Sequence, residues 1–352
     1  MFDELPTGPQ WTITSDDVGT IVADYGLVYE PSNQPEQLGG AINGVTRISH
    51  ERGDAIIRVH RPWTTPSRLT AVHDVMGTLR EAGLPVPFVF TAASGKTWST
   101  IADRLVEVQE FIPSDRPARK RTDAMLIFAE LGMLHRVLST LMLPQIPASP
   151  YDSYAPPARA LAMLDETEHI FVGDHHSDQA LQARALRARA RAVLACGQRV
   201  LSKHAHALPR QLTHGDFGGD NVLLRDEQVV GILDFDFMDT RERIYDLAYT
   251  MVMTLLRSRT PPQLSTLDDG EIADIARWRD AYETLLESSL SSAEISALPT
   301  ILAQILLYQL SEIGYQIKDG DTEGALLLTQ GQEMNLALAE WIITHQDAFG
   351  TP

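Results

Sequence analysis

Two short apolar runs on either side of a polar bend constrain the fold of this chain more than any other feature. Residues 222–224 read Val-Leu-Leu, residues 229–233 read Val-Val-Gly-Ile-Leu, and the polar residues 225–228 lie between them. This pattern predicts a tight β-hairpin of two buried strands. Polar side chains stand at both open ends of the hairpin: His214, Asp216, Asn221, Asp234 and Asp236. Because pairing brings the two ends together, we expect several oxygen-bearing side chains to converge on one small volume.

The spacing of these side chains is typical of a phosphoryl-transfer site. Mg²⁺ takes oxygen ligands and shares them with substrate phosphates, so Asn221 and Asp234 are the candidate metal ligands. Asp216 precedes Asn221 by five residues, across a glycine-containing loop, where it is placed to accept the proton of an attacking hydroxyl. Asp-x-x-x-x-Asn followed by a later Asp is also the spacing found in kinases. The alternative is an acidic hairpin with solvated carboxylates.

A longer set of motifs in the same order resembles the aminoglycoside phosphotransferase and choline kinase superfamily. The set comprises His-Gly-Asp at 214–216, Asn221, Ile-Leu-Asp-Phe-Asp at 232–236 and Arg-Ile-Tyr-Asp-Leu-Ala at 243–248, and it is most similar to the homoserine-kinase-like and antibiotic-kinase branches. The resemblance implies ATP and Mg²⁺ as cofactors. It also implies that His214 belongs to the catalytic loop and holds it through hydrogen bonds, and that Asp246 stabilises this loop.

The fold that the resemblance implies is α+β and two-lobed, like that of protein kinases. An N-terminal lobe, residues 1–114, would contain an antiparallel sheet, one main helix and the hinge. Residues 115–352 would form a larger, mainly helical lobe with the catalytic hairpin and the acceptor site. Hydrophobic periodicity predicts helices over 15–25, 67–82, 122–141, 158–170, 177–204, 242–256, 270–290, 293–316 and 323–345. It predicts strands over 27–29, 36–38, 45–49, 55–60, 88–92, 98–101 and 105–111.

The glycine-rich segment 39–44 lies between predicted strands near the N-terminus. Glycines let backbone N–H groups approach phosphates closely, so we expect Gly39, Gly40 and Asn43 to contact the nucleotide. The alternative is that these glycines serve only a hairpin turn. A second nucleotide contact is expected at the hinge between the lobes, residues 109–113, where the backbone of Glu110 and Ile112 would bind adenine.

Arg58 stands where the resemblance implies a phosphate-binding lysine. A planar guanidinium also neutralises phosphates, so we expect Arg58 to bind the phosphates in place of a lysine. The family usually pairs this cation with a Glu on the following helix, but here that position holds Val72. Asp74 is the best candidate for the missing partner, and a solvated helix residue is its alternative.

Composition excludes several classes of protein. A formal net charge of −18 over 352 residues argues against binding to nucleic acid or to an anionic membrane, and it is compatible with a cationic small-molecule partner. The single cysteine excludes an internal disulfide. The N-terminus has no basic, apolar leader and no run of 18 apolar residues occurs, so we expect a cytoplasmic protein without a membrane span.

These observations predict an enzyme that moves the γ-phosphoryl group of ATP to a hydroxyl of a small molecule. The expected acceptor is an amine-bearing antibiotic, in a resistance or self-protection role, or an amino alcohol; homoserine, choline or a sugar is the alternative. A nucleotide-binding regulator without turnover is disfavoured because Asp216, Asn221 and Asp234 are all present. A protein kinase is disfavoured because no Asp-Phe-Gly, Ala-Pro-Glu or activation-loop segment follows Asp234. The sequence leaves the choice between ATP and GTP and the oligomeric state open.

Overall fold

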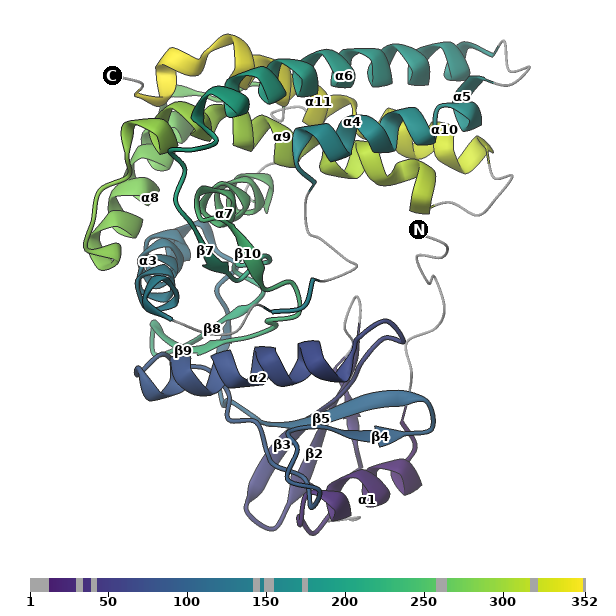
Figure 1. Cartoon of the computed structure of the whole chain (residues 1–352), viewed down its shortest axis with the longest axis vertical. Coiled ribbons are helices and arrows are strands. Elements are labelled where there is room, and N and C mark those ends of the chain that lie inside the picture. Colours follow the sequence, from purple (N-terminus) through teal and green to yellow (C-terminus); the bar gives the residue numbers. More distant parts are fainter. Residues whose placement is uncertain are drawn as a thin grey trace.

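The computed structural model describes residues 13–29, 34–38, 43–141, 146–148, 155–172, 177–257, 265–316 and 322–350. An N-terminal sheet lobe and a larger helical lobe stand one above the other (Figure 1). This is the two-lobed α+β architecture predicted from the sequence.

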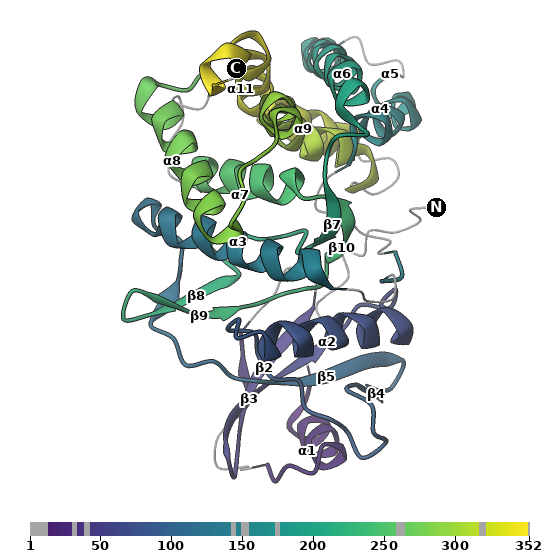
Figure 2. The ribbon, with the colours of Figure 1, turned by 60° about the vertical axis from the view of Figure 1, so that its left-hand side comes forward.

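The N-terminal lobe is built on an antiparallel sheet with strand order β1-β2-β3-β5-β4. The strands are β1 (Glu36–Gln37), β2 (Gly44–His50), β3 (Gly53–Val59), β4 (Ser99–Ile101) and β5 (Arg104–Glu110). Helix α1 (Ser15–Asp24) packs its apolar side chains against sheet residues in a core of their own. Helix α2 (Pro66–Glu81) lies between the sheet and the helical lobe (Figures 1 and 2).

The strand register fixes which side chains share a face of this sheet. Arg58 of β3 lies directly opposite Glu107 of β5, and Ile56 lies opposite Gln109. Directly opposite residues of an antiparallel pair point to the same face, with their Cβ atoms about 4.5–5.5 Å apart. Arg58 and Glu107 therefore share one face of the sheet.

The helical lobe is assembled around α9 (Ser292–Gln316), most of whose leucine and isoleucine side chains are buried. Its helices are α3 (Ala124–Thr140), α4 (Pro157–Glu166), α5 (His169–Val172), α6 (Asp178–His204), α7 (Ile244–Arg257), α8 (Asp269–Leu286), α9 (Ser292–Gln316), α10 (Thr322–Gly331) and α11 (Glu333–Thr344). Helices α3 and α8 approach closely at Gly132, where a Cβ atom would lie 2.1 Å from the carbonyl oxygen of Tyr282. Phe128 and Trp278 stack beside this crossing.

The predicted hairpin is confirmed as strands β8 (Val222–Arg225) and β9 (Gln228–Ile232). Asp226 and Glu227 between them have positive φ angles of 51° and 56°, which is the backbone of a two-residue turn that matches the twist of the strands. Strand β6 (Arg116–Pro117) pairs with β8 and thereby ties the start of the helical lobe to the hairpin.

The structure differs from the predicted elements at several places. The strand expected over 27–29 is reduced to an isolated bridge between Tyr29 and His50, and the helix expected over 158–170 is divided at Thr167 into α4 and α5. Residues 239–242 form strand β10, which pairs with β7 (Arg210–Thr213), so helix α7 begins only at Ile244. The single helix expected over 323–345 is broken at Gln332, after a glycine that lowers helix propensity. The strand expected over 88–92 is reduced to an isolated bridge between Val89 and Gln109.

Helix α9 is long and apolar enough in composition to cross a membrane over Ser292–Ile313. However, 72% of its most apolar stretch is buried inside the fold. This is the environment of a core helix, which passes the same test of length and composition.

Candidate active site

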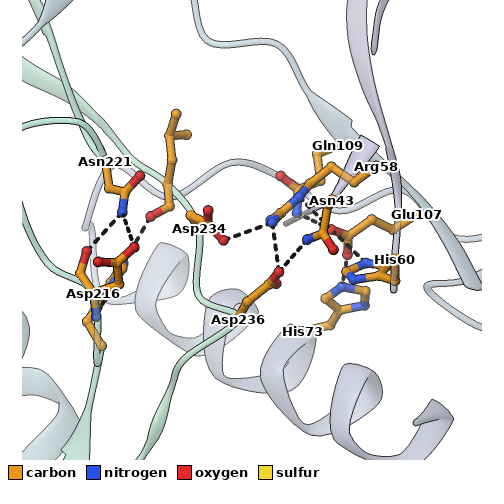
Figure 3. Close-up of polar contacts among 12 residues, drawn as sticks. Asn43, Arg58, His60, His73, Glu107, Gln109, Asp216, Asn221, Asp234 and Asp236 are labelled. Carbon is orange, nitrogen blue, oxygen red and sulfur yellow. Dashed lines mark hydrogen bonds and ion pairs between the residues drawn. The ribbon is translucent and has the colours of Figure 1, made fainter. Parts of the chain in front are cut away.

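The hairpin brings its polar ends together between the two lobes. Nδ2 of Asn221 donates hydrogen bonds to the carbonyl oxygen of Asp216 at 2.8 Å and to its Oδ2 at 3.1 Å. Asp234 lies between this pair and Arg58 of the sheet lobe (Figure 3). Nη2 of Arg58 donates to Oδ1 of Asp234 at 2.8 Å and to Oδ2 of Asp236 at 3.1 Å. Four of the residues singled out from the sequence, Arg58, Asp216, Asn221 and Asp234, therefore lie together in one site to which both lobes contribute.

Helix α7 holds the loop before the hairpin through Asp246, as expected from the sequence. The two carboxylate oxygens of Asp246 accept the backbone N–H groups of His214 at 2.7 Å and Gly215 at 2.9 Å. His135 lies 3.1 Å from the same carboxylate. Burial by itself raises the pKa of Asp246, but the hydrogen bond and charge of His135 and the charge of Arg241 outweigh burial and hold it below its ordinary value. Asp246 is thus a buried anion that fixes the loop backbone.

The loop needs a glycine at position 215. Its φ angle is 85°, and a Cβ atom there would lie 2.2 Å from the carbonyl oxygen of Phe237. An L-residue would meet both a strained backbone and a clash. Asp234 also has a positive φ, of 64°. Such backbones persist for non-glycine residues only where surrounding contacts impose them, often at functional sites.

His214 holds the loop through its ring. Nε2 donates to the carbonyl oxygen of Leu233 at 2.9 Å, and Nδ1 accepts the backbone N–H of Asp216 at 3.3 Å. Burial lowers the pKa of His214 despite the opposing charge of Asp246. A neutral imidazole with both nitrogens bonded to backbone connects the loop to the end of β9. This geometry fits support of the loop better than proton transfer.

The carboxylate of Asp216 is hydrogen-bonded at both oxygens. Asn221 reaches Oδ2, and the hydroxyl of Tyr249 donates to Oδ1. Burial raises the pKa of Asp216 to about 6, the charge of Asp234 adds to this rise, and the hydrogen bonds of Tyr249 and Asn221 oppose it. Tyr249 is a site residue that was not predicted from the sequence. Its spacing of three residues after Asp246 on a helix, which places both on one face, is the signal that identifies it.

The side chains of Asn221 and Asp234 fit a divalent cation. Because Nδ2 of Asn221 is committed to Asp216, its amide oxygen remains as a ligand. Among the described residues, no three His, Cys, Asp or Glu side chains are placed to hold a metal by themselves. A cation held by Asn221 and Asp234 would therefore complete its shell with phosphate oxygens and water, which is the usual arrangement for Mg²⁺.

Neither Val72 nor Asp74 is the partner of Arg58. Val72 is buried in the apolar core that α2 shares with the helical lobe, and Asp74 is exposed. The third carboxylate beside Arg58 is Glu107, whose Oε1 lies 3.5 Å from Nε of the arginine. The partner was missed because it comes from the sheet, not from the helix. Its signal is a Glu among the apolar residues of β5.

Glu107 lies in a buried polar cluster on the α2 side of the sheet (Figure 3). Nε2 of His73, on α2, is hydrogen-bonded to Oε2 of Glu107. Gln109 donates to Oε1 at 3.0 Å, and Nε2 of His60 lies 3.3 Å from the same oxygen. Burial raises the pKa of Glu107, but His60 and His73 outweigh it and hold this pKa well below its ordinary value. The cluster therefore keeps an ionised carboxylate beside Arg58.

The residues expected to contact the nucleotide are partly described. Gly39 and Gly40 lie outside the described residues. Asn43 is buried, and its amide donates to Oδ2 of Asp236, so the start of β2 is tied to the same site. At the hinge, the N–H of Glu110 donates to the carbonyl oxygen of Phe88 at 2.8 Å. The backbone N–H of Glu110 is therefore not available to adenine, which leaves its backbone carbonyl oxygen as the candidate contact. Ile112 lies beyond the end of β5.

A cavity of about 280 Å³ opens beside Asp216. Its walls come mainly from α7 and α9 and include Tyr249, Leu256, Ile305 and Tyr308. The polar side chains of Gln309, Glu312 and Asn335 complete the lining. Among the described residues that line it, none carries a positive charge.

Comparison with known proteins gives matches over most of the chain. A homoserine kinase of Gluconobacter oxydans (strain 621H) is 28% identical over 289 residues, which cover 81% of this chain and 79% of that protein. The structure of a microcompartment-associated aminopropanol kinase has a TM-score of 0.66 at 17% identity and covers 95% of this chain and 98% of its own. An amicoumacin kinase in complex with AMP-PNP, Ca²⁺ and Ami has a TM-score of 0.64 at 16% identity and covers 92% and 93%. These two structures share the two-lobed fold.

The family model described as "Phosphotransferase enzyme family" matches residues 36–283. This range contains the hairpin, the loop before it and all the site residues predicted from the sequence. The chain belongs to this family of phosphotransferase enzymes.

Proposed function

We propose that this enzyme transfers the γ-phosphoryl group of Mg-ATP to a hydroxyl of a small, amine-bearing acceptor. The observation that carries the proposal is the convergence of Asp216, Asn221 and Asp234 opposite Arg58. Base, metal ligands and phosphate-binding cation are the parts that phosphoryl transfer needs, since its catalysis consists mostly of positioning and charge stabilisation.

Asp216 orients the acceptor hydroxyl and receives its proton. The hydroxyl oxygen bonds to the γ-phosphorus, the bond from that phosphorus to the β,γ-bridging oxygen breaks, and ADP leaves. Tyr249 and Asn221 fix the carboxylate during this step. Arg58 neutralises phosphate charge from the sheet side, as does the backbone around Gly39, Gly40 and Asn43. A Mg²⁺ ion held by Asn221 and Asp234 supplies charge stabilisation for the phosphates.

The cavity beside Asp216 supports an amine-bearing acceptor. Two carboxylates, Asp216 and Glu312, are among its lining residues, and none of the described ones is positively charged. An ammonium group is favoured in such surroundings, whereas a carboxylate group is not. Drug-sized ligands usually occupy pockets of about 300–1,000 Å³. The cavity volume of about 280 Å³ therefore fits an amino alcohol more easily than a multi-ring aminoglycoside.

Homoserine is the second candidate acceptor. It is favoured by the similarity to a homoserine kinase, which extends over 81% of this chain. Homoserine carries a carboxylate beside its amine, so its binding needs a positive group that the described lining of the cavity does not supply.

The test is an ADP-release screen with Mg-ATP and purified protein. The panel contains amino alcohols, homoserine, choline, amino sugars and hydroxylated amine antibiotics, and Asp216→Asn is the blank. We expect turnover with an amino alcohol that is absent from the blank. Turnover with homoserine alone would replace the first candidate by the second. Failure of the protein to bind Mg-ATP would overturn the proposed function.

A further inference from the structure

Arg58, the residue proposed to bind the nucleotide phosphates, lies beside the buried carboxylate of Glu107. Arg58 and Glu107 are opposite each other in the register of β3 and β5. Both are buried, with 7% and 1% of their surface exposed. Oε1 of Glu107 lies 3.5 Å from Nε of Arg58. The far end of the same guanidinium, Nη2, points toward Asp234 and Asp236.

The carboxylates around Arg58 lie at two places on the guanidinium: Glu107 at Nε, and Asp234 and Asp236 together at Nη2. Asp234 and Asp236 belong to the helical lobe, and the side chain of Asp234 is 40% exposed. A metal held by Asp234 would neutralise that carboxylate. Glu107 is shielded from the site by Arg58 itself, so its charge remains available to the guanidinium. It is therefore the carboxylate suited to holding Arg58 in one orientation throughout the reaction.

Helix α2 contributes a histidine to this arrangement, not a carboxylate. Its acidic residues Asp74 and Glu81 are both exposed. His73 is 5% exposed, with Nε2 bonded to Glu107 and Nδ1 2.6 Å from the hydroxyl of Thr97. The helix thus reaches Arg58 through His73 and Glu107, and a second time through Arg68, which donates to the backbone carbonyl oxygen of Asp236 at 2.6 Å.

We propose that Glu107 is the positioning residue that orients Arg58 toward the nucleotide phosphates, and that His73 couples helix α2 to this pair. The proposal rests on the proposed function, because it assumes that Arg58 binds phosphate. In this chain a carboxylate of strand β5, Glu107, would then orient the phosphate-binding cation. In the family this is usually done by a Glu on the helix that follows the strand of the cation. An isolated buried carboxylate would cost several kcal/mol. Its contacts with Arg58, His60, His73 and Gln109 offset that cost.

The test is a double-mutant cycle on the binding of Mg-ATP, with Glu107→Gln, Arg58→Gln and the double variant. Calorimetry measures the Kd of Mg-ATP and, separately, of adenosine, which has no phosphates. We expect Glu107→Gln to weaken Mg-ATP by about 10-fold, in the range of coupling between contacting residues, and to leave adenosine unchanged. In the Arg58→Gln background the same substitution should have almost no further effect on Mg-ATP.

A matched control is Glu168→Gln in the helical lobe. Glu168 lies between α4 and α5 and contacts two arginines of α6, the half-buried Arg191 at 2.6 Å and the buried Arg187 at 3.5 Å. This variant should lower the thermal midpoint and leave both Kd values unchanged. If Glu107→Gln does not fold, Glu107→Asp is used in its place. Its side chain is one methylene shorter, so it keeps the negative charge but places it farther from Arg58. It should also weaken Mg-ATP, and wild-type affinity would overturn the proposal.

The outcomes separate this inference from the proposed function. If Arg58→Gln weakens Mg-ATP and Glu107→Gln does not, the inference fails alone. The inference also fails if Glu107→Gln weakens adenosine as much as Mg-ATP, or if the two substitutions are additive, because either result means a general structural role. If Arg58→Gln itself leaves Mg-ATP binding unchanged, the proposed role of Arg58 fails and the inference fails with it.

Discussion

Tyr249 donates a hydrogen bond from its hydroxyl to Oδ1 of Asp216. Two neighbours on the same helix contact the same loop: Asp246 accepts the N–H groups of His214 and Gly215, and Thr250 donates to the carbonyl oxygen of Phe217 at 2.9 Å. Three residues of α7 therefore hold the loop of residues 214–217 through hydrogen bonds. The position of the proposed base depends on a helix that begins 28 residues later in the chain.

Tyr249→Phe should lower kcat by about 10- to 100-fold, because a hydrogen bond to a charged group contributes about 1.5–3 kcal/mol. The Kd of Mg-ATP should not change, since Tyr249 bonds the base and lines the cavity beside it. Steady-state kinetics and calorimetry measure the two quantities. Thr254→Val is the control on the same helix, because that hydroxyl bonds only to the carbonyl oxygen of Thr250. Wild-type kcat in Tyr249→Phe would contradict a role for this bond.

Asp216→Asn should reduce turnover by about 100- to 10,000-fold, the usual contribution of a general base. The amide keeps the shape of the side chain and its contact with Tyr249, so the fold and Mg-ATP binding should persist. ADP release and nucleotide binding are measured on the same preparation. Turnover near that of the wild type would show that Asp216 is not the base.

Asp234→Asn should remove most of the Mg²⁺ dependence of ATP binding. Asn tolerates the positive φ of 64° at this position better than Ala does, so the variant tests the charge of the ligand with little backbone strain. Calorimetry with ATP, with and without Mg²⁺, gives the comparison. Asp226→Asn, at the opposite end of the hairpin and also at a positive φ of 51°, should behave like the wild type. An unchanged Mg²⁺ dependence in Asp234→Asn would count against the ligand role.

Gly215→Ala should destabilise the protein strongly, because a Cβ atom at 215 would lie 2.2 Å from the carbonyl oxygen of Phe237 at a φ of 85°. Gly218, three residues later, has no atom within 4 Å of such a Cβ, so Gly218→Ala is the matched control. Thermal unfolding of both variants is the measurement. We expect a lower midpoint only for Gly215→Ala, and equal midpoints would show that the loop can move away from Phe237.

The stabilising contribution of Glu107 should depend on pH. Its pKa in the folded state is well below its ordinary value, because His60 and His73 outweigh the effect of burial. The contribution is therefore complete above the unfolded-state pKa of about 4.3 and is lost as pH falls through the folded-state pKa. Urea unfolding of the wild type and of Glu107→Gln from pH 5 to pH 3 measures it, because His60, whose pKa is raised by the charge of Glu107, stays protonated over this range. The difference in unfolding free energy should shrink below about pH 4.3; a difference that grows on acidification would contradict this sign.

Local sequence patterns were enough to predict the hairpin and to single out the three polar residues at its ends. Asp216, Asn221 and Asp234 lie within 19 positions of one another, so the alternation of apolar and polar residues and one tight turn are enough to bring them together. Most helices were also predicted, since a buried face repeats along the helix with a period that is visible in the sequence.

The residues that support this site come together through long-range packing, which local sequence patterns do not specify. Glu107 faces Arg58 because of the register between β3 and β5, which are separated by helix α2 and strand β4. Asp74 was the better candidate from the sequence, but the direction of α2 leaves it exposed. Tyr249 and the cavity walls meet because α7 packs against α9, some 50 residues later. Such contacts depend on how whole elements pack, and local periodicity shows which face of an element is buried but not which neighbour it meets.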